Sequence, residues 1–165
     1  MIIREIKTSD AENLAVLIQQ VEGSSQYMLW EKGERNFQSD NQLKMIESMK
    51  DNENSTILVA EVENGLIGYL LVIGGNTKRN RHSGSIVIGI LKGYRGKGVG
   101  TLLFGELEQW ASKHNLRRLE LTVVTRNKAG LSLYKKMGFE IEGTKKGSLY
   151  IDGEYLDEYY MSKIL

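Results

Sequence analysis

The stretch YRGKGVGTLLFGELEQW, residues 94–110, alternates three glycines with other residues just before a helical pattern begins. The first turn of a helix has unpaired N–H groups and a partial positive charge, so it attracts anions. Glycine lets the backbone come close to a ligand and adopt positive φ. The pattern therefore predicts an anion site that is best suited to phosphate. The residues that we expect to form this site are Arg95, Gly96, Lys97, Gly98, Val99, Gly100 and Thr101.

The two cations in this stretch, Arg95 and Lys97, favour a bound anion over an empty turn. The helix dipole disfavours a cation near the helix start by about 0.3–1 kcal/mol, and no acidic residue follows before Glu106. A bound polyanion would make the net electrostatic energy of these two cations favourable. An ordinary loop, whose glycines serve only the turn, is the alternative, because glycine motifs also arise by chance.

Two common nucleotide sites do not fit the spacing of these glycines. A Walker phosphate loop needs a lysine directly after its second glycine; Gly93 and Gly98 have the required separation, but Val99 follows. A Rossmann fingerprint would need a glycine at Thr101. It would also place the glycines after the first strand, whereas here three earlier strands precede the strand that leads into them. The spacing therefore argues against nucleoside triphosphates and dinucleotides.

The elements that position this stretch follow from the hydrophobic pattern. We expect strands at residues 2–7, 55–62, 66–75, 84–90, 117–124, 139–146 and 154–164, and helices around residues 14–21, 43–49, 99–114 and 127–138. The segment 22–38 has no clear period and is expected to be a loop that packs over something, because it carries several bulky residues. The order β-αα-βββ-α-β-α-ββ predicts one mixed α/β domain that spans residues 1–165.

Composition excludes several kinds of chemistry. The chain has no cysteine, which excludes disulfides, thiol nucleophiles and thiolate metal sites, and its two histidines lie far apart, so we expect no metal. The formal net charge is +1, so nothing global favours a nucleic-acid or membrane partner. No segment approaches the ~20 apolar residues of a membrane span, and the start of the chain does not resemble a signal peptide. We therefore expect a cytoplasmic protein.

The pattern Arg95-x-x-Gly98-x-Gly100, after a strand and at the start of a helix, resembles the acyl-CoA pyrophosphate loop of the GNAT superfamily of N-acetyltransferases. Further along, LTVVTRNKAGLSLYKKMGF, residues 121–139, resembles the second GNAT signature: a strand, an Asn, and a helix that contains Leu-Tyr and ends in Gly-Phe. The order of the expected elements matches that fold over nearly the whole chain. One departure is Lys92, where the superfamily often has a proline.

The end of the chain, GFEIEGTKKGSLYIDGEYLDEYYMSKIL, narrows the resemblance. It is similar to the branch that includes L-amino-acid, ribosomal-protein N-terminal and polyamine acetyltransferases, and most similar to the L-amino-acid group. The resemblance implies transfer of an acetyl group from acetyl-CoA to the primary amine of a small molecule, such as an L-amino acid, by direct attack in a ternary complex. A protein N-terminus or a polyamine as acceptor, and a non-catalytic acyl-CoA-binding regulatory module, stay open. A homodimer is expected on resemblance alone.

The same resemblance implies a mixed, mostly antiparallel sheet with flanking helices, in which the fourth and fifth strands splay apart. The backbone of the fourth strand, at Ile88, Ile90 and Leu91, would bind the pantetheine arm of acetyl-CoA. Gly89 would form a bulge in that strand. A backbone N–H near Ile90 would stabilise the oxyanion that forms when the amine attacks the thioester.

Tyr134 matches the superfamily tyrosine that faces the sulfur of the thioester, and its implied role is general acid. The alternative is a core aromatic, because Tyr134 shares a helical face with Gly130 and Met137. Asn127 would touch the CoA arm, and it would also cap the helix that carries Tyr134.

The sequence assigns no general base. Glu61, Glu120 and His82 lie on or near central strands, but each has a structural or solvated role as its alternative. A water chain would serve as well. Acceptor contacts are expected from Tyr27 and Met28, with Trp30, which would line an apolar pocket; ordinary packing of the loop is the alternative.

Overall fold

The computed structural model describes residues 1–35, 38–63 and 65–165. Phe37, one of the bulky residues in the expected loop, lies outside the described residues. The strands are β1 (Ile2–Glu5), β2 (Thr56–Val62), β3 (Gly65–Gly74), β4 (Ser83–Ile90), β5 (Arg118–Val124), β6 (Glu140–Ile151) and β7 (Glu154–Ile164). The helices are α1 (Ala11–Ser24), α2 (Ser39–Lys50), α3 (Val99–Lys113) and α4 (Lys128–Lys136), with short 3₁₀ turns η1 (Thr8–Asp10) and η2 (Lys92–Tyr94).

The strands form one sheet in the order β1-β2-β3-β4-β5-β7-β6. The β4–β5 pair is parallel, and every other neighbouring pair is antiparallel. The predicted α/β fold with a mixed, mostly antiparallel sheet is confirmed. The largest difference from the expected boundaries is β6, which continues to Ile151 through an irregularity in its pairing with β7 between Lys145 and Leu149.

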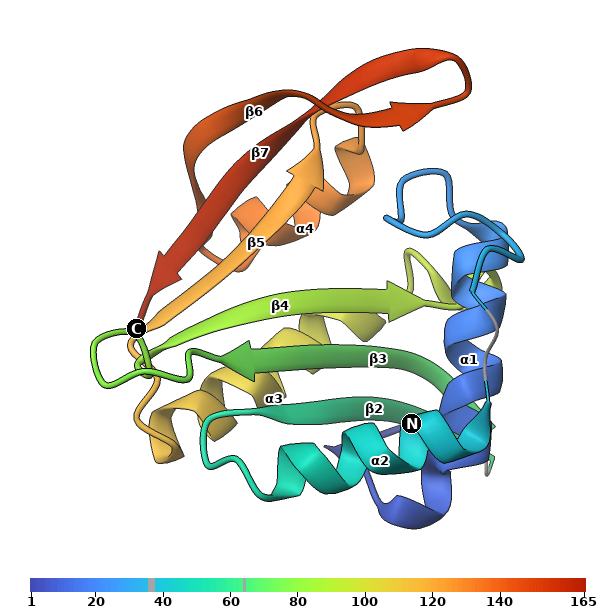
Figure 1. The fold of residues 1–165 in the computed structure, drawn as a ribbon, viewed down its shortest axis with the longest axis vertical. Helices are drawn as coiled ribbons and strands as arrows, with labels where there is room; N and C mark the ends of the chain where they lie inside the picture. Colours follow the sequence, from blue (N-terminus) through green and yellow to red (C-terminus); the bar gives the residue numbers. More distant parts are fainter. Residues whose placement is uncertain (36–37, 64) are drawn as a thin grey trace.

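The strands β4 and β5 diverge, as the resemblance implied. They pair only where Ser83, Gly84 and Ser85 face residues 118–120, and beyond this closed end the two strands separate (Figure 1). The predicted splay is therefore confirmed. Among the residues that the structure describes, the edge of β4 that faces β5 has no strand partner beyond Ser85, so its backbone groups face a gap in the middle of the sheet.

The predicted bulge at Gly89 is wrong, because β3 and β4 stay in continuous register from Gly74↔Gly84 to Gly68↔Ile90. A glycine is required at position 89 for a different reason. Tyr69 on β3 lies directly opposite Gly89, and a Cβ atom at residue 89 would lie 2.5 Å from Cε1 of the Tyr69 ring. The aromatic ring therefore occupies the space that any larger residue at position 89 would need.

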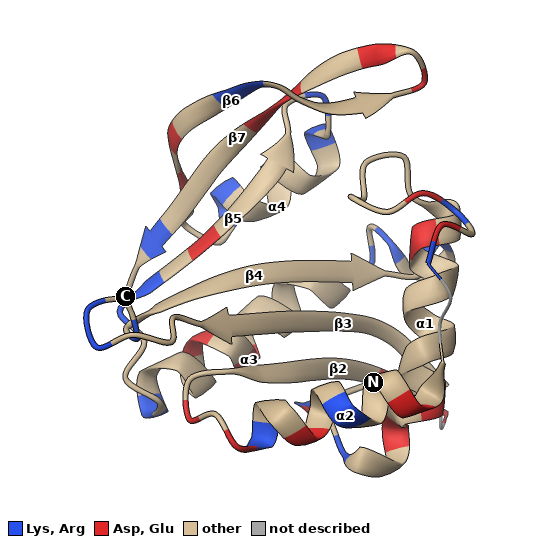
Figure 2. Cartoon of the chain, in the orientation of Figure 1, with Lys and Arg blue, Asp and Glu red and all other residues tan. Residues whose placement is uncertain are grey.

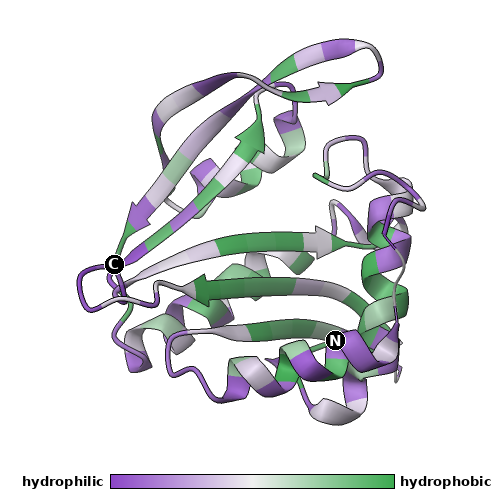
Figure 3. Ribbon diagram, viewed as in Figure 1, coloured by the Kyte–Doolittle hydropathy of each residue, from purple (hydrophilic) through white to green (hydrophobic). Residues whose placement is uncertain are grey.

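Helices cover both faces of the first part of the sheet. In Figure 1, α2 passes in front of the strands and α3 lies behind them. The strands β3 and β4 carry no charged residue (Figure 2), and β2 to β4 are largely hydrophobic (Figure 3). Near the closed end, Ile73 on β3 and Val87 on β4 are nevertheless 50% and 44% exposed. Residues 57–60 of β2 are at most 1% exposed. The half of the sheet formed by β5, β7 and β6 is more polar (Figures 2 and 3).

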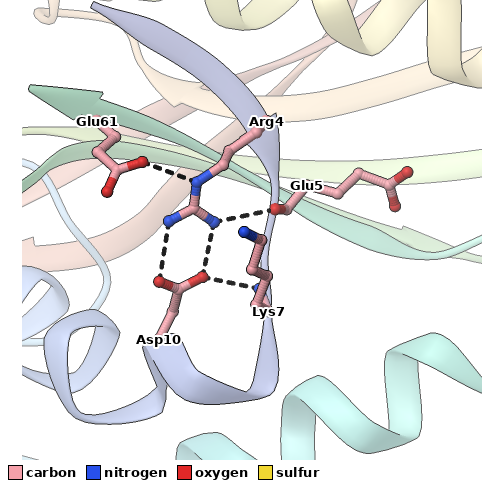
Figure 4. Close-up of polar contacts among 5 residues, drawn as sticks. All are labelled: Arg4, Glu5, Lys7, Asp10 and Glu61. Carbon is pink, nitrogen blue, oxygen red and sulfur yellow. Dashed lines mark hydrogen bonds and ion pairs between the residues drawn. The ribbon is translucent and has the colours of Figure 1, made fainter. Parts of the chain in front are cut away.

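Arg4 on β1 forms side-chain contacts with both η1 and the neighbouring strand β2 (Figure 4). Both terminal nitrogens of Arg4 donate to the carboxylate of Asp10, at 2.8 and 3.0 Å, and its Nε donates to Glu61 at 2.9 Å. The Asp10 carboxylate also accepts the backbone N–H of Lys7 at 2.8 Å. The Arg4 hydrogen bonds hold the pKa of Asp10 below its usual range. Glu61 is thus a structural partner of Arg4 on the outer strands.

In the described part of the chain, no helix is long and apolar enough to cross a membrane.

Candidate active site

The glycine-rich stretch connects β4 to α3, as the sequence predicts. Gly98 is the residue before the helix and has a left-handed backbone with φ of 84°, and Gly96 has φ of 72°. A Cβ atom at either position would meet no described residue within 4 Å, so the described part of the chain leaves the space above these two glycines open. The first turn of α3 contains no acidic residue and has no side-chain cap. The start of α3 is therefore shaped and charged to receive an anion.

The first turn of α3 contributes both to the anion site and to helix packing. The Val99 side chain is 2% exposed and belongs to the core, so only its backbone N–H can contribute to an anion site. Gly100 is buried, and a Cβ there would lie 2.7 Å from Cδ2 of Leu133 on α4. The third glycine thus permits close packing of α3 against α4. The packing brings the helix that carries Tyr134 next to the start of α3.

Basic side chains surround this turn. The Arg95 Nε donates to the carbonyl oxygen of Ile90 at 3.1 Å, and its Nη2 lies 3.4 Å from Oγ of Ser24 at the end of α1. The Lys97 ammonium lies 5.6 Å from the ring centre of Tyr94. The Lys136 Nζ donates to Thr101 Oγ1 at 3.3 Å. Within the described ranges, no carboxylate forms an ion pair with these three cations, so their charge is available to an anion.

The edge of β4 that faces the gap presents backbone groups from alternate residues. The Leu91 N–H donates to Ile67 on β3 at 2.9 Å, and its carbonyl accepts from Tyr94 at 2.9 Å. Because successive residues of a strand direct their backbone groups to opposite sides, Ile88 and Ile90 face the gap. Of the three residues that we expected to bind the pantetheine arm, Ile88 and Ile90 are suitably oriented, although the Ile90 carbonyl already accepts a hydrogen bond from Arg95. Both polar backbone groups of Leu91 are used within the chain.

Tyr134 lies on α4 and packs edge-on against Phe104 and Phe139, with ring centres 5.9 and 6.3 Å away. Part of its surface remains accessible, yet burial raises the pKa of Tyr134 to about 12. No hydrogen bond to its hydroxyl is formed by the residues that the structure describes. The aromatic packing and an available phenol are compatible, so both roles expected from the sequence stay open.

Asn127 is the residue before α4, and its Oδ1 accepts the backbone N–H of Gly130 at 3.0 Å. The predicted helix cap is confirmed. This bond fixes the start of the helix on which Tyr134 lies.

The predicted acceptor residues have different environments. Met28 packs against the hydrophobic core beneath α1 and α2, which matches the alternative of ordinary packing. Trp30 is 39% exposed, and the guanidinium of Arg35 lies over its ring at 4.9 Å. Tyr27 is half-buried, and its backbone N–H donates to Ser25 Oγ at 3.2 Å. Arg35 is a residue of this segment that sequence patterns did not single out.

Two of the three residues considered as general bases, Glu120 and His82, lie at the closed end of the gap, whereas Glu61 is bound by Arg4 on β1. Glu120 accepts hydrogen bonds from Arg118 at 3.0 Å and from Ser85 at 3.3 Å, at the closed end. It borders a cleft of about 550 Å³. His82 is exposed and directly precedes β4. Ser85 and Ile90 are five positions apart along the strand, which corresponds to about 16 Å. Neither Glu120 nor His82 therefore lies beside Ile90.

Comparisons with known proteins agree with this arrangement. Residues 25–139 match the model of the Acetyltransferase (GNAT) family. The chain is 32% identical over 119 residues to the L-amino acid N-acetyltransferase AaaT of Escherichia coli (strain K12), which covers 72% of this chain and 74% of that relative. The crystal structure of a GNAT-family acetyltransferase from Streptococcus pneumoniae has a TM-score of 0.95 and 32% identity, and covers 99% of this chain and 98% of that one.

A third similar protein was solved with its cofactor acetyl-CoA: yncA from Salmonella typhimurium, with a TM-score of 0.88 and 19% identity over 99% of this chain and 93% of that one. At this identity the likeness concerns the fold. The splayed sheet, the glycine turn and the family match together define an acyl-transfer enzyme class. This chain belongs to the GNAT family of acetyltransferases. The family and the enzyme class predicted from residues 94–110 and 121–139 are confirmed.

Proposed function

We propose that this protein transfers the acetyl group of acetyl-CoA to the primary amine of a small molecule, with a free L-amino acid as the acceptor. The observation that carries the proposal is the exposed edge of β4 at Ile88 and Ile90 directly before an anion site at Gly98. This is the arrangement that a long thiol arm with a pyrophosphate at one end requires. The acetyl-CoA in the Salmonella typhimurium protein of the same fold supports the donor, and the name of the Escherichia coli relative supports the acceptor.

The donor would bind through backbone groups and cations. Open space above Gly96 and Gly98 fits a pyrophosphate, and the N–H groups at the start of α3 would bind its oxygens. Arg95 and Lys97 would neutralise its charge, which removes the unfavourable placement of cations at a helix start. The backbone of Ile88 and Ile90 would hydrogen-bond the pantetheine amides as an added strand does.

The chemistry is an attack of the neutral amine on the thioester carbon. A new C–N bond forms, the C–S bond breaks, and the amine loses its proton to water. The Ile90 N–H would donate to the oxygen that becomes negative during the attack. The Tyr134 phenol would donate a hydrogen bond to the departing thiolate. Since its pKa of about 12 exceeds the ~8.5 of an ordinary thiol, the phenol would stabilise the thiolate mainly as a hydrogen-bond donor.

A panel of amines tests this proposal. Purified protein is mixed with acetyl-CoA and each amine, and the released CoA thiol is measured over time. Turnover on free L-amino acids, with little on peptides or polyamines, is the expected result. Turnover on peptides alone would point to acetylation of protein N-termini instead. Tight binding of acetyl-CoA without turnover on any amine would overturn the enzymatic proposal and leave a binding module.

A further inference from the structure

The end of α1 contains a buried charge. Glu22 is 4% exposed, and its carboxylate forms an ion pair with the guanidinium of Arg35. Removing two charges from water is costly, and a buried ion pair is often less stabilising than well-packed apolar residues. Such a pair beside a candidate site therefore deserves a functional explanation in addition to a structural one.

The two partners of this ion pair differ in their access to solvent. The Glu22 side chain is 3% exposed, whereas that of Arg35 is 36% exposed. Arg35 also lies over the face of Trp30, at 4.9 Å from the ring centre. The carboxylate behind it and the aromatic ring beside it restrict the position of the guanidinium, while one part of the side chain remains at the surface. This arrangement holds a cation in place for an external ligand.

Two observations relate this ion pair to the gap in the sheet, namely its electrostatic effect on Tyr69 and a hydrogen bond from Arg95 to Ser24. The Tyr69 ring lies over Gly89 on β4, and the tyrosine oxygen is 2.8 Å from the place where a Cβ of Gly89 would be. Burial raises the pKa of the Tyr69 phenol; the Glu22 carboxylate adds to the rise and Arg35 opposes it, so both charges act on this ring. Ser24, two residues after Glu22, contacts Arg95 of the glycine turn. In Figure 1 the segment after α1 lies at the open end of the gap.

We propose that Arg35, held by Glu22 and Trp30, binds the carboxylate of the acceptor and thereby makes the enzyme specific for zwitterionic amino acids. A guanidinium fork matches a carboxylate geometrically and forms charge-assisted hydrogen bonds with it. A polyamine carries no anion and would be repelled by Arg35. In a peptide the carboxylate next to the amine is replaced by an amide. This inference rests on the proposed function and specifies the acceptor of that same site.

The test compares an amino acid with its amide, which keeps the amine and side chain but lacks the carboxylate. The decisive quantity is the ratio of kcat/KM for the acid to that for the amide, measured in the wild type and in Arg35→Met. Differences in amine pKa cancel when the two proteins are compared at one pH. The wild-type ratio should fall by about 10- to 100-fold in Arg35→Met, through KM for the acid, while kcat/KM for the amide stays within about 3-fold.

Three further variants serve as controls for this comparison. Arg126→Met removes an arginine that pairs with Glu154 at 2.5 Å outside this cluster, and its ratio should equal that of the wild type. If Arg35→Met does not fold, Arg35→Gln, which keeps hydrogen-bond donors without the charge, takes its place. Glu22→Gln should lower the ratio less than Arg35→Met, because the cation remains but is held less firmly.

An unchanged ratio in the Arg35 variants, or equal losses for acid and amide, would overturn the proposed role of Arg35. Failure of the function itself has a different result, namely no acetylation of acids, amides, peptides or polyamines. In that case the role of Arg35 is still tested by calorimetric titration of the acid and the amide into protein loaded with CoA. Preferential binding of the acid that is lost in Arg35→Met supports the carboxylate site, and equal binding of both contradicts it.

Discussion

The ring of Tyr69 on β3 covers Gly89 on the neighbouring strand β4 and occupies the space of the side chain that Gly89 lacks. The contact places an aromatic ring and its hydroxyl on the face of β4 that is turned toward α1 and α2. The register of β4 with β3 is continuous through this contact. Tyr69 belongs to the hydrophobic cluster against which Met28 of the segment after α1 packs, so the ring lies between that cluster and the strand that is proposed to hold the donor.

This contact predicts the effect of a small substitution. Gly89→Ala would place a Cβ 2.5 Å from the Tyr69 ring, so the ring or β4 must move. We expect a loss of about 1–3 kcal/mol in the free energy of unfolding, measured by urea denaturation, because the interior has no room for an added methyl. Gly93→Ala is the matched control, since a Cβ there would meet nothing within 4 Å. Equal stability of the two variants would contradict the close contact.

The glycine turn predicts a selective loss of donor binding. Gly98→Val places a β-branched residue at φ of 84°, at the point where the backbone must approach the pyrophosphate. We expect the Kd for acetyl-CoA, measured by calorimetry, to rise by about 10-fold or more. Gly105→Ala on the same helix, where a Cβ would also meet nothing within 4 Å, should bind like the wild type. Wild-type affinity in Gly98→Val would remove the proposed phosphate site.

The proposed role of Tyr134 predicts a change in rate without a change in donor affinity. Tyr134→Phe keeps the ring contacts with Phe104 and Phe139 but removes the phenol. We expect kcat to fall by about 100-fold or more and the Kd for acetyl-CoA to change by less than about 2-fold. Tyr150→Phe, at a residue that is 62% exposed, is the control and should keep the wild-type rate. An unchanged kcat in Tyr134→Phe would leave the tyrosine with a packing role only.

The pH dependence of the same reaction follows from the raised pKa of the Tyr134 phenol. The protonated phenol is the competent form, and a pKa of about 12 keeps it protonated at every pH below that value. The acceptor amine must lose a proton, so kcat/KM should rise as the pH rises toward the amine pKa, which is ~8–10 for ordinary amines. Loss of the phenol proton should not lower the rate below about pH 11. A decline near pH 9 in a protein that remains folded by circular dichroism would contradict this assignment.

The Arg4–Asp10 contact predicts a pH-dependent contribution to stability. Because Arg4 lowers the folded-state pKa of Asp10, this contribution is present above the ordinary carboxyl value of ~3.9 and is lost as the pH falls through the lower folded-state pKa. Asp10→Asn should therefore cost about 1–3 kcal/mol at pH 7 by urea denaturation. The difference from the wild type should shrink below pH 4. A difference that is the same at pH 7 and at pH 3 would contradict the ionic origin.

Much of the fold could be predicted from the sequence, since local patterns determine it. Alternation and helical periodicity locate the strands and helices to within a few residues, except at β6, where the irregular pairing near Lys145 continues the strand beyond the apolar pattern. The Arg95-x-x-Gly98-x-Gly100 pattern identifies the turn because its glycines and the helix start are neighbours in sequence. The site residues assigned there stay predictions until binding is measured.

The parts that sequence patterns missed depend on contacts between distant residues. A glycine within a strand indicates a bulge or a close approach, and only the register of β3 with β4, which brings Tyr69 to Gly89, distinguishes the two. Gly100 similarly depends on the approach of Leu133 from α4. Glu22 and Arg35 resemble ordinary surface charges in the sequence, and their burial is determined by how the loop folds back onto α1.

The most direct test of the central claim is mass-spectrometric detection of the product after incubation with acetyl-CoA and free L-amino acids. We predict an N-acetyl amino acid that forms in equal amount to the released CoA, and that forms more slowly with Gly98→Val when the acetyl-CoA concentration is below the Kd of that variant. A wild-type protein that binds acetyl-CoA tightly but forms no N-acetyl product with any amino acid would contradict the account.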